Sequence, residues 1–217
     1  MEESSITDHP FIKRANKVKS SELQKSVKTS HNIKSRQFHF KVCRSVELSE
    51  TMKDQIWTIF ENNMKTLYIS SGVFPWDPKS KKEEIFNKYS RFLLVTPQEE
   101  DSESKREDKL LAYSIFRFER DEERNAIYVY ELQTSKDARR LGLGKALIDS
   151  MKSIGRTYKM SILMLTLIKA NETAKIFYES IGFETDETSP DFDEVSEEEE
   201  DDEDTGYSIL SISIGDS

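Results

Sequence analysis

Cysteine and histidine are scarce in this chain of 217 residues. Its one cysteine, Cys43, excludes a disulfide framework within the chain and favours a reducing compartment. The last of its three histidines is His39, and no zinc-binding constellation is predicted. We therefore expect chemistry that needs neither a metal nor a disulfide.

Long apolar runs are also missing. No stretch approaches the ~20 apolar residues that cross a bilayer. The N-terminal sequence MEESSITDHP lacks the apolar region of a signal peptide. The length suits one domain, and we expect a soluble intracellular protein without a membrane partner.

The net charge of −9 is unevenly distributed. From Lys13 to Arg44 the chain is basic, with Glu22 as the only acid, whereas Asp191–Asp204 is almost wholly acidic. A net acidic surface disfavours direct nucleic-acid binding and favours a basic peptide partner. The acidic run has a plainer interpretation as a solvating loop.

Hydrophobic periodicity predicts strands and helices in a mixed order. Period-2 patterns predict about seven strands, at Gln37–Arg44, Arg91–Thr96, Leu110–Glu119, Ala126–Thr134, Ser161–Ile168, Phe183–Glu187 and Gly206–Ile214. Helical spacing predicts helices over 20–32, 52–68, 79–88, 145–157 and Glu172–Ser180, and residues 1–20 are expected to be disordered. The strand–helix–strand order from Ala126 to Ile168 requires a parallel crossover, whereas the strands before it form a hairpin.

These elements predict a mixed α/β fold with a central twisted sheet flanked by helices. We expect a basic N-terminal extension at 1–36 that is partly disordered or helical. The folded domain then spans 37–217 and carries an acidic loop at 188–205.

Two glycines, Gly142 and Gly144, stand directly after a predicted strand and open a helix. Without side chains they let backbone N–H groups approach an anion, and the helix N-terminus adds partial positive charge. Arg139, Arg140 and Lys145 add full charges, which together suit a pyrophosphate. The spacing is not that of a P-loop, and no third glycine completes a dinucleotide fingerprint. A glycine-rich turn without a ligand is the alternative.

Arg139–Gly144 resembles the R/Q-x-x-G-x-G/A motif of GNAT acetyltransferases, which binds the pyrophosphate of acetyl-CoA. The segment Asn171–Phe183 looks like a second signature of that family, N-x-x-A-x-x-F-Y-x-x-x-G-F. The resemblance extends over Gln37–Ile214 and implies the GNAT fold, acetyl-CoA as cosubstrate and no metal.

Shorter stretches resemble the NatD-type enzymes within that superfamily. These are YVYELQ, LTLIKAN, DETSPD and YSILS, together with an aromatic loop ending in Trp76 and the basic N-terminal extension. The resemblance implies acetylation of the Ser-Gly-Arg-Gly N-termini of histone-4 and histone-2A. It also implies a monomer that works in the cytoplasm and nucleus.

The resemblance assigns the cofactor site to the strand before the glycine motif, to the motif itself and to one helix cap. The residues are Leu132, Gln133, Thr134, Arg139, Arg140, Leu141, Gly142, Leu143, Gly144, Lys145 and Asn171. A backbone N–H near Leu132 would bind the thioester oxygen, and the amine attacks without a nucleophilic residue.

Two residues are candidates for proton transfer. A terminal amine has a pKa of about 7.7–8.0 against about 10.4 for lysine, so a moderate base is enough. Glu131 is the candidate base, with an ordinary strand-edge carboxylate as the alternative. Tyr178 stands where the family places a tyrosine that protonates the leaving thiolate, with a core aromatic as the alternative.

The peptide slot is assigned by resemblance to aromatic, acidic and hydroxyl residues. They are Tyr68, Trp76, Tyr128, Tyr130 and Tyr207 as walls, Glu119 as the reader of the substrate arginine, and Thr166 and Ser189 as hydrogen-bonding groups. For each aromatic residue alone, core packing is the alternative. Strict alternation would place Tyr128 and Tyr130 on one face of their strand, with Val129 and Glu131 on the other.

Two rival functions stay open at this stage. One is a GNAT enzyme that acetylates a small amine or a lysine. The other is a non-catalytic acidic module that binds histone tails through the run Asp191–Asp204. Release of CoA thiol would separate an enzyme from a binding module.

Overall fold

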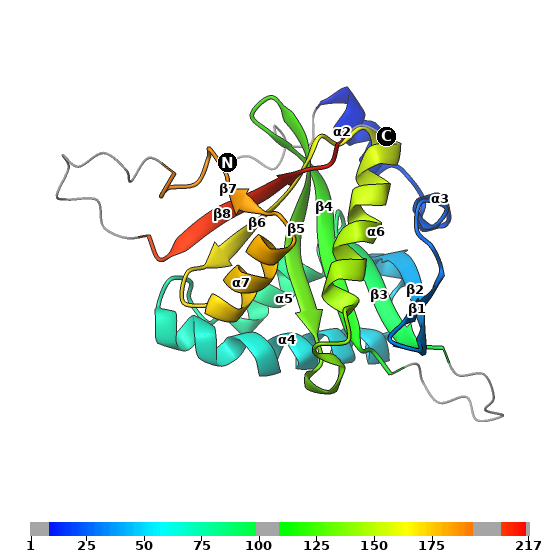
Figure 1. Cartoon of the computed structure of the whole chain (residues 1–217), viewed down its shortest axis with the longest axis horizontal. Helices are drawn as coiled ribbons and strands as arrows, with labels where there is room; N and C mark the ends of the chain where they lie inside the picture. The colour runs from blue at the N-terminus through cyan, green and yellow to red at the C-terminus, as the bar shows by residue number, and fades with distance from the viewer. Residues whose placement is uncertain (1–8, 99–108, 193–204, 216–217) are drawn as a thin grey trace.

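The computed structural model describes residues 9–98, 109–192 and 205–215, which form a central sheet with helices around it (Figure 1). The strands are β1 (Ser30–Ile33), β2 (Arg36–Arg44), β3 (Arg91–Pro97), β4 (Ala112–Asp121), β5 (Arg124–Thr134), β6 (Ile162–Ile168), β7 (Glu184–Thr185) and β8 (Tyr207–Ser213). The helices are α2 (Pro10–Asn16), α3 (Ser20–Gln24), α4 (Glu50–Ser71), α5 (Pro78–Ile85), α6 (Leu143–Tyr158) and α7 (Glu172–Ser180). Short 3-10 turns lie at Ser45–Glu47 and Lys136–Ala138.

The sheet has the order β1-β2-β3-β4-β5-β6-β8-β7. Among the described strands β5 and β6 are the one parallel pair, and α6 makes the crossover between them. The other neighbours are antiparallel. The predicted mixed sheet flanked by helices is confirmed, and it gains β1, a strand that the sequence did not indicate.

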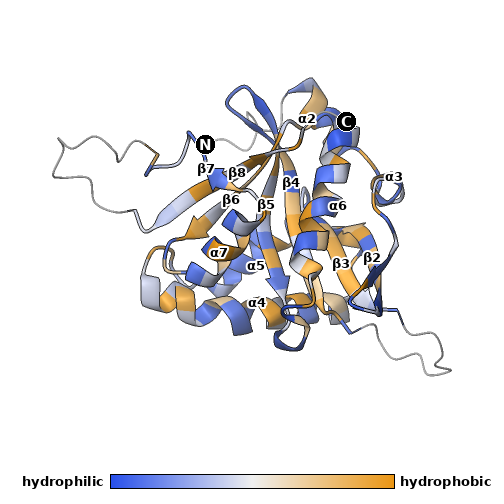
Figure 2. Ribbon diagram, in the orientation of Figure 1, coloured by the Kyte–Doolittle hydropathy of each residue, from blue (hydrophilic) through white to orange (hydrophobic). Residues whose placement is uncertain are grey.

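Helices cover both faces of this sheet (Figure 1). The larger core lies under α6 and α7 and includes Leu147, Met151 and Tyr178. A second core lies under α4 and α5, around Ile56 and Phe60. Figure 2 shows apolar residues along β3 and β4 and many polar residues on the outer side of α6. The sheet therefore separates two cores.

Helix α4 follows the predicted pattern at both ends. The Ser49 side chain accepts a hydrogen bond from the Met52 N–H and caps the first turn. Ile56 and Phe60, four residues apart, are fully buried on one face. The helix ends at Gly72, whose φ of 66° suits a residue without a side chain. The helix runs through Ser71, beyond the expected end near residue 68.

The N-terminal extension belongs to the folded core from residue 9 onward, which corrects the expectation of disorder over 1–20. Ile12, Ala15, Leu23 and Val27 are buried in the larger core. The expected helix over 20–32 is limited to α3, because its second half forms β1 and pairs with β2. The buried apolar residues of this segment are few and stand among many lysines, so the sequence pattern indicated its helices only weakly. Residues 1–8 lie outside the described part.

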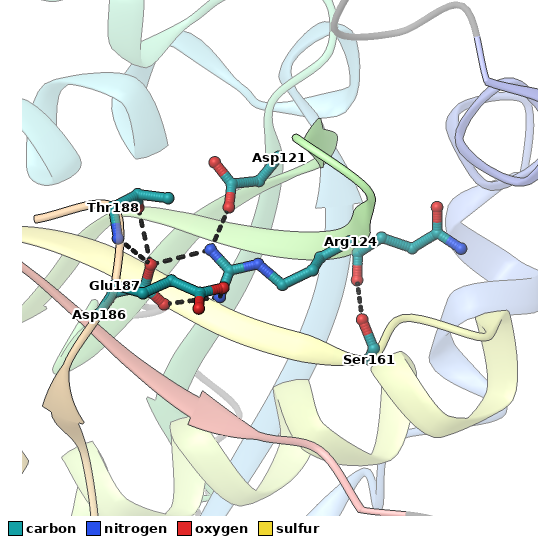
Figure 3. Close-up of polar contacts among 7 residues, drawn as sticks. Asp121, Arg124, Ser161, Asp186, Glu187 and Thr188 are labelled. Carbon is teal, nitrogen blue, oxygen red and sulfur yellow. Dashed lines mark hydrogen bonds and ion pairs between the residues drawn. The ribbon is translucent and has the colours of Figure 1, made fainter.

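An arginine clamp fixes the turn after β4 to the segment after β7 (Figure 3). The Arg124 guanidinium donates to both oxygens of Asp186, at 2.8 and 2.9 Å, and also to Asp121. Burial alone would raise the pKa of Asp186, but Arg124 and Thr188 hold that pKa well below its ordinary value. The DETSPD stretch is thus a folded turn held by charge.

Candidate active site

Strands β5 and β6 part halfway along their length. Their pairing begins at Ala126 and Ile162 and ends at Val129 and Leu165. Beyond that point β5 stays paired with β4, while β6 stays paired with β8. The two strand edges therefore face each other across an opening with unpaired backbone groups, which suits an extended, amide-containing ligand.

A β-bulge in β5 lies at this opening. Ile115 faces Glu131 and Phe116 faces Val129, so Tyr130 is the extra residue. A bulge bends the strand and interrupts its alternation. The prediction that Glu131 shares a face with Val129 is wrong for this reason: Val129 belongs to the larger core under α6, whereas Glu131 contacts α5 on the other face.

A cavity of about 510 Å³ occupies the opening. Its walls come from α4, the loop before α5, α5 itself, both parted strands and α7. The predicted site residues among its walls are Tyr68, Trp76, Tyr128, Tyr130, Glu131, Leu132, Gln133, Thr166, Asn171 and Tyr178. Segments more than 100 residues apart in the chain thus meet at one site.

The glycine motif forms the start of α6 beside this opening. Gly142 has a φ of 91° and caps α6 without a side-chain hydrogen bond, so the first-turn N–H groups lack a partner within the helix. A Cβ on Gly144 would lie 3.0 Å from the Phe177 ring, so only glycine fits there without a shift. Arg140, Lys145 and Gly142 are exposed. Such a cradle fits the pyrophosphate of a CoA thioester, and the strand opening fits its pantetheine arm.

The β1–β2 hairpin reaches this motif from the N-terminal segment. The Lys34 ammonium donates to the Arg140 carbonyl at 2.6 Å, and a Cβ on Gly142 would lie 3.3 Å from Ile33. Gly142 is therefore exposed but lies beside Ile33 at the end of β1. Lys34 adds a cation beside the motif that the sequence analysis did not identify.

Glu131 is buried, with 6% of its side chain exposed, and both of its oxygens have partners. Lys81 of α5 lies 2.9 Å from Oε1, and the Gln133 amide donates to Oε2 at 2.8 Å. Lys81 also contacts Glu84 at 2.6 Å. Burial lowers the pKa of Lys81, but the two carboxylates outweigh it and raise that pKa above its ordinary value. Glu131 is thus a buried carboxylate in the cavity wall, held on one oxygen by Lys81 and on the other by Gln133.

A chain of hydrogen bonds connects Glu131 to the glycine motif. Arg139 donates to the Asn63 oxygen at 2.7 Å, and Asn63 donates to Gln133 at 2.9 Å and to the Thr134 carbonyl at 3.0 Å. Because a guanidinium only donates and a carboxylate only accepts, the orientation of both amides is fixed. Gln133 therefore holds Glu131 through its side chain, a role beyond the predicted cofactor contact.

Tyr178 is buried on α7 and lies in the cavity wall. Its ring packs edge-on against Phe177 and Phe183, at 5.0 and 5.2 Å between centroids. Burial and then the nearby charge of Glu131 raise the pKa of its phenol, which stays protonated at neutral pH. Tyr178 is therefore a core residue whose protonated phenol borders the cavity.

Four of the predicted aromatic residues, Tyr68, Trp76, Tyr128 and Tyr130, line one part of the cavity, which we call its mouth. Trp76 and Tyr68 pack against each other and against Phe60. The ring centroids of Tyr128 and Tyr130 are 5.3 Å apart, and the Tyr128 hydroxyl forms a hydrogen bond with the Thr166 hydroxyl at 2.5 Å. Tyr207 does not line the cavity, but its ring lies 5.7 Å from Phe74, which does.

Glu119 and Ser189 lie outside the cavity walls. Glu119 accepts a hydrogen bond from the Tyr130 hydroxyl at 2.8 Å, which links it to the mouth. Ser189 is buried, donates to Asp191 and accepts from the Ile209 N–H at 2.8 Å. Its hydroxyl is used within the DETSPD turn, so the structure gives no support to a substrate contact.

Sequence reasoning missed Lys81, Glu84 and Asn63, which complete the polar part of the site. Helix α5 reads PKSKKEEI and starts with an Asp77 cap. Its charges surround the helix, so no pattern singled out Lys81. Asn63 lies on the polar side of an amphipathic helix, where an asparagine is common and does not indicate a functional site. Only the tertiary arrangement brings them to Glu131.

Within the described residues, no three metal-ligating side chains are grouped so as to hold an ion. No helix in the described part of the chain is long and apolar enough to span a bilayer.

Known proteins share both the sequence pattern and the architecture. Residues 104–196 match the acetyltransferase (GNAT) domain family. The fold resembles Tetrahymena GCN5, with 15% identity and a TM-score of 0.55 over 81% of this chain and 96% of that one. It also resembles the ribosomal-protein-S18-alanine N-acetyltransferase of Escherichia coli, with 17% identity and a TM-score of 0.51 over 82% and 96%. A chain of the NatC complex bound to Gag peptide and CoA matches with 13% identity and a TM-score of 0.53 over 81% and 98%.

Proposed function

We propose that this chain, which has the GNAT fold and carries an acetyltransferase domain that uses acetyl-CoA, acetylates the N-terminal amines of histone-4 and histone-2A. The observation that carries the proposal is Glu131, a buried carboxylate in an aromatic-walled cavity where β5 and β6 part. A cationic amine is drawn to such a site by charge and by the faces of aromatic rings.

Acetyl-CoA supplies the acetyl group when it is bound. The Glu131 carboxylate accepts the proton of the peptide's ammonium, which leaves a neutral amine. A β5 backbone N–H near Leu132 orients the thioester carbonyl and stabilises the oxyanion. Tyr178 holds a phenolic proton within the cavity for the departing sulfur. A terminal amine needs about 3.4 kcal/mol less than lysine to be deprotonated at neutral pH, so a carboxylate is a sufficient base.

Substrate choice rests on the mouth of the cavity. Glu119, linked to Tyr130, provides an acid group for an arginine at the third substrate position. Two of the proteins that share the fold are named for a protein or peptide ligand, the ribosomal-protein-S18-alanine N-acetyltransferase and the NatC complex bound to Gag peptide and CoA, which supports a peptide substrate. We propose that the enzyme is a monomer that acts in the cytoplasm and nucleus, without direct nucleic-acid or membrane contact.

The test is acetylation of a Ser-Gly-Arg-Gly peptide that also contains an internal lysine. We expect acetylation of the free N-terminus and none of the same peptide with a blocked N-terminus, measured by mass spectrometry and CoA thiol release. Equal acetylation of the blocked peptide at lysine would favour the rival GNAT activity. Tight peptide binding without thiol release would favour a binding module.

Glu119 is tested separately. Glu119→Ala should weaken turnover of the arginine peptide and matter much less when that arginine is replaced by alanine. An equal loss for both peptides would show that Glu119 does not read the arginine.

A further inference from the structure

Lys81 is the one cation that contacts Glu131 among the described residues, and it comes from a helix outside the sheet. Its ammonium lies 2.9 Å from Glu131 and 2.6 Å from Glu84. The rings of Phe60 and Tyr68 lie 5.3 and 5.8 Å from it. With 13% of its side chain exposed, Lys81 is enclosed by acids and ring faces.

The charges of this cluster do not cancel. Within the cluster of Lys81, Glu131 and Glu84, two carboxylates share one ammonium, which leaves one negative charge. The Arg117 guanidinium lies nearby, 3.9 Å from the Tyr130 ring, but donates to the Glu84 backbone carbonyl and not to a carboxylate of the cluster. Glu131 is almost fully buried and Glu84 is 40% exposed, so the cluster extends from the interior to solvent. A buried carboxylate without a cation tends to take up a proton, and it then accepts no proton from an amine.

Orientation follows from the same contacts. Lys81 holds one oxygen of Glu131 and Gln133 holds the other, so the carboxyl group cannot rotate freely. Each oxygen keeps a second lone pair for a further donor. An incoming ammonium can therefore bind without displacing either partner.

We propose that Lys81 is the positioning residue of Glu131: it pairs with one oxygen of the carboxylate and holds the group turned into the cavity, and with Glu84 it leaves the cluster one negative charge for the substrate's ammonium. Lys81 acts through Glu131 and takes no part in the bond changes. This inference rests on the proposed function.

The test compares Lys81→Met, Lys81→Arg and a matched control, Lys79→Met, which changes an exposed lysine outside the cavity on the same helix. Lys81→Met should lower kcat by at least about 10-fold. This loss should be smaller than the ~10²–10⁴-fold loss expected when the base itself is removed. The acid limb of its kcat/KM profile should move to higher pH, because a buried carboxyl without its cation is protonated more readily. The other titratable groups near Glu131 are the phenols of Tyr68, Tyr113 and Tyr178, whose raised pKa values keep them neutral over this range. Lys81→Arg keeps the charge and should retain the wild-type profile with part of the rate.

A wild-type pH profile and rate in Lys81→Met would overturn the inference, as would a Lys81→Arg profile shifted as far as that of Lys81→Met. CoA affinity, measured by calorimetry, and the melting temperature separate a misfolded variant from a folded variant with a lowered rate. If Glu131→Gln loses activity while Lys81→Met does not, the base stands and the positioning role fails. If wild-type protein does not acetylate the free N-terminus at all, the proposed function fails instead.

Discussion

The two parts of the proposed site are built on different principles. The proposed cofactor half consists of consecutive residues, Arg139–Gly144, which lie beside the cavity, and of the parted strand edges with their unpaired backbone groups. The peptide half consists of side chains from α4, α5 and β5 that meet only in the folded protein. A local backbone motif can be read from a sequence, whereas a side-chain cluster of distant origin cannot. The comparison predicts that the cofactor half is sensitive to backbone geometry and the peptide half to charge.

The largest effect is expected from Gly142→Trp. The position combines a φ of 91° with a neighbour 3.3 Å from an added Cβ, so a bulky side chain blocks the cradle. We expect loss of measurable acetyl-CoA binding by calorimetry. Gly72→Trp is the matched control, since Gly72 has a similar φ of 66° but no neighbour within 4 Å of an added Cβ. Undiminished affinity in a folded Gly142→Trp protein would refute the cradle.

The arginine clamp should affect stability and not chemistry. Arg124→Met leaves Asp186 buried without its partner and should cost about 2–3 kcal/mol, less than a fully buried pair because Arg124 is 23% exposed. The lowered pKa of Asp186 stabilises the fold at pH above the unfolded value of about 3.9 and this contribution is lost as pH falls further. The melting-temperature difference from wild type should therefore be full at neutral pH and shrink below about pH 4.

A matched variant, Arg120→Met, changes a neighbouring arginine whose guanidinium donates to the Asn125 side chain at 2.8 Å. It should lower the melting temperature much less. A constant Arg124→Met difference down to about pH 2 would contradict the assignment of this stability to Asp186.

Asn63 connects the two halves, and Asn63→Leu sharpens the comparison. The substitution leaves the Gln133 oxygen without its donor, a cost of about 1–3 kcal/mol for a buried polar group, and loosens the amide that holds one oxygen of Glu131. We expect a several-fold lower kcat with little change in CoA affinity, measured by steady-state kinetics and calorimetry. Asn62→Leu, its exposed neighbour, is the control. Equal losses in both variants would mean that the chain of hydrogen bonds carries no function.

The smallest effect is expected from deleting Glu197–Asp204, which lies outside the described residues. Turnover of a short peptide should be nearly unchanged, while encounter with whole basic histones slows at low salt. Stopped-flow association at two salt concentrations measures this difference. A collapse of short-peptide turnover in a folded deletion would contradict it.

The sequence predicted the sheet, its parallel crossover and the helix that follows the glycines, because periodicity and glycine spacing are local properties. It failed at β1, whose pairing with β2 is decided by tertiary contact. It also failed at Glu131's face, because one extra residue, Tyr130, reverses the alternation. The role of Lys81 could not be predicted, because an ion pair between α5 and β5 leaves no pattern in the sequence of either segment.

The most direct test of the account is the pH dependence of Glu131→Gln on a Ser-Gly-Arg-Gly peptide. We expect the maximal rate at neutral pH to fall by about 10²–10⁴-fold with the peptide still bound. The loss should lessen as pH rises past about 8, where the amine loses its proton unaided. A Glu131→Gln enzyme that keeps its wild-type maximal rate at neutral pH would contradict the account, because another group or water would then take the proton.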